Sequence, residues 1–166
     1  MSASLAEIFR RAPDLASFRR SVAALGGDFP FASADMIELG KAYFERFPDR
    51  VQDRNADEVR LGYAVVRTAV IEKAVLGLAP DRRAAFREML DDVSRVGPTV
   101  EGLIGTAGSE ALGADIERLS SVLADVRATI DEIPKGMIKE RFIGGISNLF
   151  NILYVIRMKA PRPDPV

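Results

Sequence analysis

The 166-residue sequence contains no histidine and no cysteine. Histidine is the usual general base near neutral pH, the most common transition-metal ligand and the usual proximal ligand of haem. Its absence therefore excludes a Ser-His-Asp triad, zinc sites of the usual type and His-ligated haem. The absence of cysteine excludes disulfides, thiolate metal sites and cysteine nucleophiles. Lys, Tyr, Asp and Glu can still act as acids or bases, but they form no recognisable catalytic arrangement, so the sequence does not indicate an enzyme and predicts no cofactor or metal.

A strong net charge is also missing. Lys plus Arg number 23 and Asp plus Glu 24, which gives a formal charge of −1. No overall field draws such a protein to nucleic acid or to anionic lipid, so we predict no nucleic-acid partner, and a membrane-surface role is not favoured. The first residues show no long apolar run behind a basic head, as a secretory signal would, so a cytoplasmic location is expected.

Long hydrophobic runs are scarce, and the longest uncharged stretch is FIGGISNLFNILYVI at residues 142–156. A membrane-spanning helix needs about 20 mainly apolar residues, and this stretch is shorter and includes glycines, a serine and two asparagines. On a helix its large apolar residues form one stripe, whereas Gly144, Asn148 and Asn151 fall together on another face. Either the helix is central and buried nearly all round, or Asn148 and Asn151 are the polar anchors of a mainly apolar ligand pocket.

Strand-like alternation is absent, and apolar residues recur at helical spacing almost throughout. We predict an all-α fold: a single-domain bundle of six or seven helices over residues 1–160, ending in a long antiparallel helical hairpin, with an extended Pro-rich tail at 161–166. Helices are expected at about 4–13, 14–26, 33–48, 55–79, 81–96, 112–133 and 137–159. Ser4 and Glu7 have the spacing of a capping box for the first helix, and Asp14 can cap the second. The fifth helix is expected to end at Gly97 and Pro98, and apolar residues at alternating steps of four and three form a stripe along 112–133. The glycine-rich segment 97–113 is expected to be a short or broken helix that serves as a lid or a connector.

The two C-terminal helices have complementary charges. Residues 109–133 carry two arginines and six carboxylates, whereas residues 135–166 carry six basic and two acidic side chains. The basic end of the chain therefore has an acidic neighbour within the same hairpin and does not require lipid or nucleic acid.

An acidic cluster in the fifth expected helix, Glu88, Asp91 and Asp92, has a spacing that can bring carboxylates together for a hard divalent ion. However, Arg87 and Arg95 stand four residues on either side of Asp91, the spacing of ordinary helical ion pairs. Ion pairs are therefore predicted here in preference to a metal site.

Two groups of arginines allow more than one interpretation. Arg67 lies inside an apolar run, where it either holds an acidic group as a buried charge or extends its head to the surface. The pair Arg19 and Arg20 is most simply a solvated helix face.

Two functions remain after these exclusions. The first is a non-catalytic α-helical interaction or regulatory module that associates with a protein partner or with itself, a homodimer being the expected assembly. The alternative is a sensor or carrier of a small apolar ligand in a pocket between helices. The candidate pocket residues are Asn148, Asn151, Gly144, Phe150, Tyr63 and Arg67.

Overall fold

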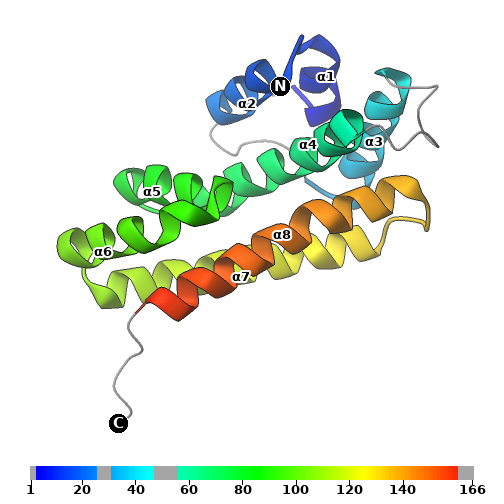
Figure 1. The fold of residues 1–166 in the computed structure, drawn as a ribbon. Helices are drawn as coiled ribbons and strands as arrows, with labels where there is room; N and C mark the ends of the chain where they lie inside the picture. Colours follow the sequence, from blue (N-terminus) through cyan, green and yellow to red (C-terminus); the bar gives the residue numbers. More distant parts are fainter. Residues whose placement is uncertain (1–2, 26–30, 47–55, 161–166) are drawn as a thin grey trace.

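The structure, a computed structural model, describes residues 3–25, 31–46 and 56–160. Within these ranges it contains eight α-helices, one short 3-10 helix and no strand, which confirms the predicted all-α multi-helix bundle (Figure 1). The helices are α1 (Leu5–Arg11), α2 (Leu15–Ala24), α3 (Ser33–Arg46), α4 (Ala56–Val75), α5 (Pro80–Asp91), α6 (Val96–Ala107), α7 (Ser109–Asp131) and α8 (Met137–Lys159). The predicted Pro-rich tail lies outside the described residues.

The first helices begin where the sequence places a cap. The backbone N–H of Glu7 donates to Ser4 Oγ and that of Ser4 to Glu7 Oε2, both at 3.2 Å, which is the predicted capping box. The backbone N–H of Ser17 donates to Asp14 Oδ1 at 2.7 Å, and this bond lowers the pKa of Asp14. Local hydrogen bonding therefore fixes the entry into α1 and α2.

The end of α5 differs from the prediction, which carried this helix to Val96. The structure ends it at Asp91, because Asp92 has an extended backbone with φ −142°. The carboxylate of Asp92 accepts from Ser94 N at 3.0 Å and from Ser94 Oγ at 2.7 Å, and these bonds lower its pKa. This side chain competes with the helix for the backbone and starts the 3-10 helix Val93–Arg95.

The glycine-rich segment was predicted to be a short or broken helix, and the structure divides it into the 12-residue helix α6, which buries Val100 and Leu103, and the start of α7. Pro98 is tolerated because it is the third residue of α6, where a backbone N–H has no partner within the helix. The helical conformation is interrupted at Gly108, which has φ +90° and separates α6 from α7. A positive φ is accessible to glycine without strain, so the joint falls at this residue.

Helix α8 packs against α4, α6 and α7. The apolar stripes predicted for α7 and α8 are buried, and together with residues from the other helices they form one hydrophobic cluster. Lys139, near the start of α8, donates to the carbonyl of Asp131 at 2.9 Å, whereas Arg157, near its end, pairs with Glu117 at 3.2 Å. The two helices therefore lie side by side and run in opposite directions (Figure 1). The ion pair of Arg157 with Glu117 joins them.

Helix α4 lies between α2 and α8 in Figure 1 and contacts both of them, and it also contacts α5. This arrangement places one face of α4 against α2 and α5, away from the C-terminal helices. Among the described helices, none has both the length and the apolarity needed to cross a membrane.

Candidate functional site

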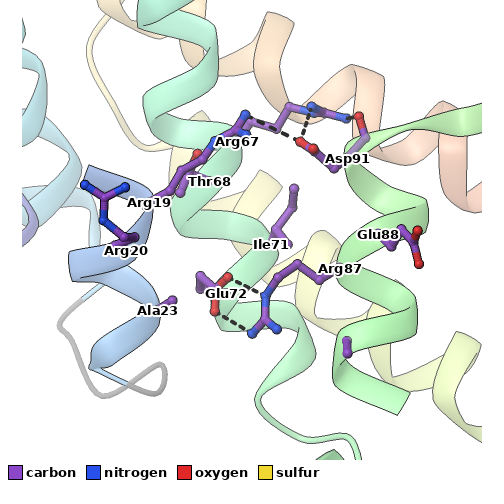
Figure 2. Close-up of a pocket in the computed structure, with 11 residues that line it drawn as sticks. Arg19, Arg20, Ala23, Arg67, Thr68, Ile71, Glu72, Arg87, Glu88 and Asp91 are labelled. Carbon is purple, nitrogen blue, oxygen red and sulfur yellow. Dashed lines mark hydrogen bonds and ion pairs between the residues drawn. The ribbon is translucent and has the colours of Figure 1, made fainter. Parts of the chain in front are cut away.

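A pocket of about 490 Å³ opens between α2, α4 and α5 (Figure 2). Its volume is within the range of small-molecule sites, about 300–1,000 Å³. Each helix contributes residues spaced by three or four positions, which lie on one helix face. The lining residues are Arg19, Arg20 and Ala23 from α2, Arg67, Thr68, Ile71 and Glu72 from α4, and Ala84, Arg87, Glu88 and Asp91 from α5.

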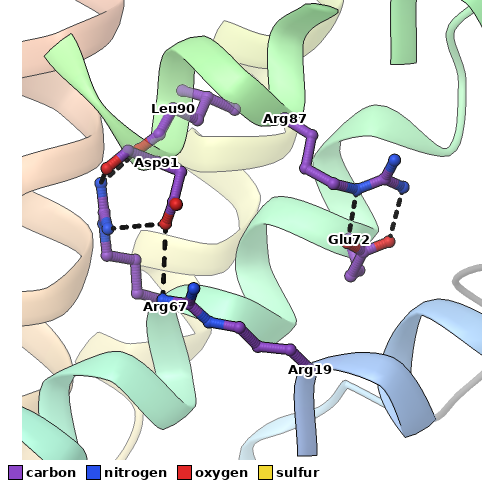
Figure 3. Close-up of polar contacts among 6 residues, drawn as sticks. All are labelled: Arg19, Arg67, Glu72, Arg87, Leu90 and Asp91. Atoms are coloured by element: carbon purple, nitrogen blue, oxygen red, sulfur yellow. Dashed lines mark hydrogen bonds and ion pairs between the residues drawn. The ribbon is translucent and has the colours of Figure 1, made fainter. Parts of the chain in front are cut away.

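Arg67 joins α4 to the C-terminal end of α5 (Figure 3). Its guanidinium donates to the carbonyl oxygens of Leu90 and Asp91, the latter at 3.2 Å, and lies 3.5 Å from Asp91 Oδ1. The side chain is only 19% exposed, and burial lowers the pKa of Arg67 while the Asp91 carboxylate opposes this shift. An arginine keeps its charge under such a shift, so Arg67 is a partly buried cation that contacts an acidic group, which is closer to the first of its two interpretations.

The Nε of Arg67 is buried, and within the described ranges no hydrogen-bond acceptor reaches it. Leaving a buried donor unpaired costs free energy. The bonds of this guanidinium to the end of α5 offset that cost and hold the side chain in place. A cation at the last carbonyls of a helix is also favoured by the helix dipole.

Arg87 and Glu72 form the strongest ion pair of the pocket. Arg87 donates to both carboxylate oxygens of Glu72, at 2.7 and 2.9 Å, and these bonds raise the pKa of Arg87. The Glu72 side chain is only 8% exposed. The predicted pairs of Arg87 and Arg95 with Asp91 are therefore wrong: Arg87 reaches across to α4, and Arg95, which lies beyond the end of α5, pairs with Glu88 at 3.1 Å.

Arg19 and Arg20 belong to the pocket, whereas the sequence indicated a solvated face. Arg19 lies 3.4 Å from Asp91 Oδ1, so this carboxylate serves both Arg19 and Arg67. Arg20 donates to Ser17 Oγ on its own helix at 3.0 Å and lies near the Asp14 carboxylate, whose pKa it helps to lower. The two cations at the α2 edge are thus weakly held compared with Arg87.

The candidate residues on α8 lie elsewhere. Gly144, Asn148 and Asn151 are exposed, Phe150 is half-buried against the core, and none of them lines the pocket between α2, α4 and α5. The expectation that α8 is buried nearly all round is therefore wrong, because this polar face is uncovered. A ligand role for these residues stays a prediction.

Of the candidates on α4, Arg67 lines the pocket, and the side chain of Tyr63 is outside the described part of the chain. The sequence also carried a signal that was missed. Thr68 and Glu72 are polar residues four positions apart in the mainly apolar end of α4, and both are buried in the structure, at 7% exposure each. Polar residues at this spacing mark a second face of α4.

The acidic cluster Glu88, Asp91 and Asp92 is divided among other partners: Glu88 pairs with Arg95, Asp91 with two arginines, and Asp92 caps the 3-10 helix. Across residues 3–25, 31–46 and 56–160, no group of three or more acidic side chains is arranged to hold a metal ion.

No protein-family model, curated protein or solved structure matches this chain. A function for the protein is therefore argued from its own structure.

Proposed function

We propose that the protein is a non-catalytic sensor or carrier of a small molecule that occupies the pocket between α2, α4 and α5. The observation that carries this proposal is the pocket of about 490 Å³, whose surface is mainly carbon although seven of its eleven lining residues are charged. Small-molecule sites combine apolar surface with polar groups that orient the ligand, and they often lie between the helices of a bundle. Of the two functions predicted from the sequence, the ligand-binding alternative therefore has the stronger support.

The walls of the pocket offer apolar surface to a ligand. Ile71, from α4, is 5% exposed, and Ala23 from α2 and Ala84 from α5 also line the pocket. The arginines add the aliphatic part of their side chains beneath their charged heads. A ligand with an apolar body thus finds carbon to contact on all three helices.

Filling the pocket should abolish ligand retention. Ala84 is exposed at the pocket wall, so Ala84→Phe places a ring in the opening at little cost to the core. Native mass spectrometry of the purified wild-type protein is expected to show an added mass that disappears on denaturation, and Ala84→Phe should lose it. The matched control is Ala124→Phe at an exposed position of α7, which should keep the added mass. A wild-type protein with equal native and denatured masses would contradict the proposal.

A second candidate function, self-association as an interaction module, is favoured by the exposed face of α8. Tyr154 is 64% exposed and Met158 57% exposed, and they lie four residues apart on the same helix face. Tyrosine and methionine are enriched in protein interfaces, so this face is the proposed contact between two copies.

Sedimentation analysis tests this second candidate. The wild-type protein is expected at twice the chain mass of 18.1 kDa, and the double variant Tyr154→Ser, Met158→Ser at the mass of one chain. Val93→Ser removes a residue that is 49% exposed on the 3-10 helix and should leave the dimer intact. A wild-type protein at the mass of one chain across the micromolar range would overturn this proposal.

A further inference from the structure

The charges around the pocket identify the class of ligand. Four arginines and three carboxylates line it, so one positive charge is left over. The carboxylates differ in how closely arginines contact them. Arg87 donates to Glu72 at 2.7 and 2.9 Å, whereas Asp91 is shared by two arginines at 3.4 and 3.5 Å. The excess positive charge therefore lies toward the α2 edge, where Arg20 donates to Ser17 Oγ and has the Asp14 carboxylate nearby, whose pKa it helps to lower.

We infer that the ligand is an amphipathic monoanion, such as a carboxylate with an apolar chain. This inference rests on the proposed ligand-binding function. The acid group binds Arg19 and Arg20 at the edge of the pocket, and the chain lies against Ala23, Ile71 and Ala84. Guanidinium groups match acid groups because their planar donors form paired, charge-assisted hydrogen bonds.

The long distances around Asp91 leave room for such a ligand. Arg19 is 44% exposed and its pair with Asp91 is 3.4 Å long, so its guanidinium can turn to an incoming acid group while Arg67 keeps Asp91 and the carbonyls of α5. A cationic ligand would be repelled by the arginines at this edge, and a neutral ligand would gain no affinity from their charge. The pocket therefore selects by charge at its edge and by apolar contact inside.

Calorimetric titration of the full chain tests this inference with four probes: decanoate, decanol, decylammonium and inorganic phosphate. Decanoate is expected to bind at least tenfold more tightly than decanol, which has the same chain without the charge. Decylammonium and inorganic phosphate should bind more weakly still, because one has the wrong charge and the other has no chain. Ala84→Phe should abolish the binding of decanoate.

Two double variants separate a local site from general attraction. Arg19→Gln with Arg20→Gln is expected to weaken decanoate at least tenfold and to leave decanol unchanged. Arg11→Gln with Arg127→Gln removes the same charge outside the pocket lining and should leave both affinities unchanged. An equal loss in the two double variants would overturn the inference, since the anion would then not be bound at α2.

The remaining outcomes distinguish this inference from the proposed function. Equal affinity for decanoate and decanol, both lost in Ala84→Phe, would overturn the anionic ligand and keep the pocket. Binding of none of the probes would also overturn it, and the proposed function would fall only if the purified protein carried no added mass. A lipid surface is a second source of the same chemistry, and co-sedimentation with phosphatidylglycerol vesicles tests for it. If the wild-type protein bound the vesicles but not decanoate, and Arg19→Gln with Arg20→Gln abolished vesicle binding, the inference of a free amphiphilic ligand would be overturned.

Discussion

Replacing Arg87 by alanine is expected to lower the free energy of unfolding by about 2 kcal/mol. The variant leaves the Glu72 carboxylate, whose side chain is 8% exposed, without its cation. Breaking a fully buried ion pair from one side costs about 3–5 kcal/mol, whereas exposed pairs contribute about 1 kcal/mol or less. The Arg87 side chain is 42% exposed, so water screens part of the loss and an intermediate value is expected. Urea denaturation of the variant and the wild-type protein measures the difference.

The control for this prediction is Arg95→Ala, which breaks the pair between Arg95 and Glu88. Both partners are exposed, at 61% and 50%, so the loss should be at most about 1 kcal/mol. The double variant Glu72→Leu, Arg87→Met should recover most of the stability, because no buried charge is left without a partner. Equal losses in Arg87→Ala and Arg95→Ala would show that Glu72 is not a buried carboxylate held by Arg87.

Those parts of the fold that depend on neighbours in the sequence could be predicted. The capping box of Ser4 and Glu7 and the cap at Asp14 are decided within one helical turn, and both are formed as expected. The apolar stripes of α7 and α8 follow from helical spacing alone. The errors lie where two local tendencies compete, as at Asp92, whose side chain ends α5 early, and at Pro98, which a first helical turn accommodates.

Little of the candidate site could be predicted, because its contacts join helices that are distant in the sequence. Only Arg67 was anticipated. Arg19 was interpreted as a solvated residue since nothing near it in the sequence requires a partner, and its contact with Asp91 exists only once α2 and α5 meet beside α4. The same holds for Arg87, whose spacing predicted a pair within α5 but whose guanidinium reaches Glu72 on the preceding helix. Helix packing, and not spacing in the sequence, therefore determines which carboxylate each of these arginines contacts.

Two neighbouring residues of α8 offer the largest contrast in expected stability. Leu149→Ala should lower the free energy of unfolding by about 3 kcal/mol, because the side chain is fully buried and its removal leaves a cavity in the core. Asn148→Ala should change it by no more than about 0.5 kcal/mol, because Asn148 is exposed. Urea denaturation of both variants and of the wild-type protein measures the two differences. A loss at Asn148 as large as that at Leu149 would mean that this face of α8 is covered, by a second copy or by a ligand, in the folded protein.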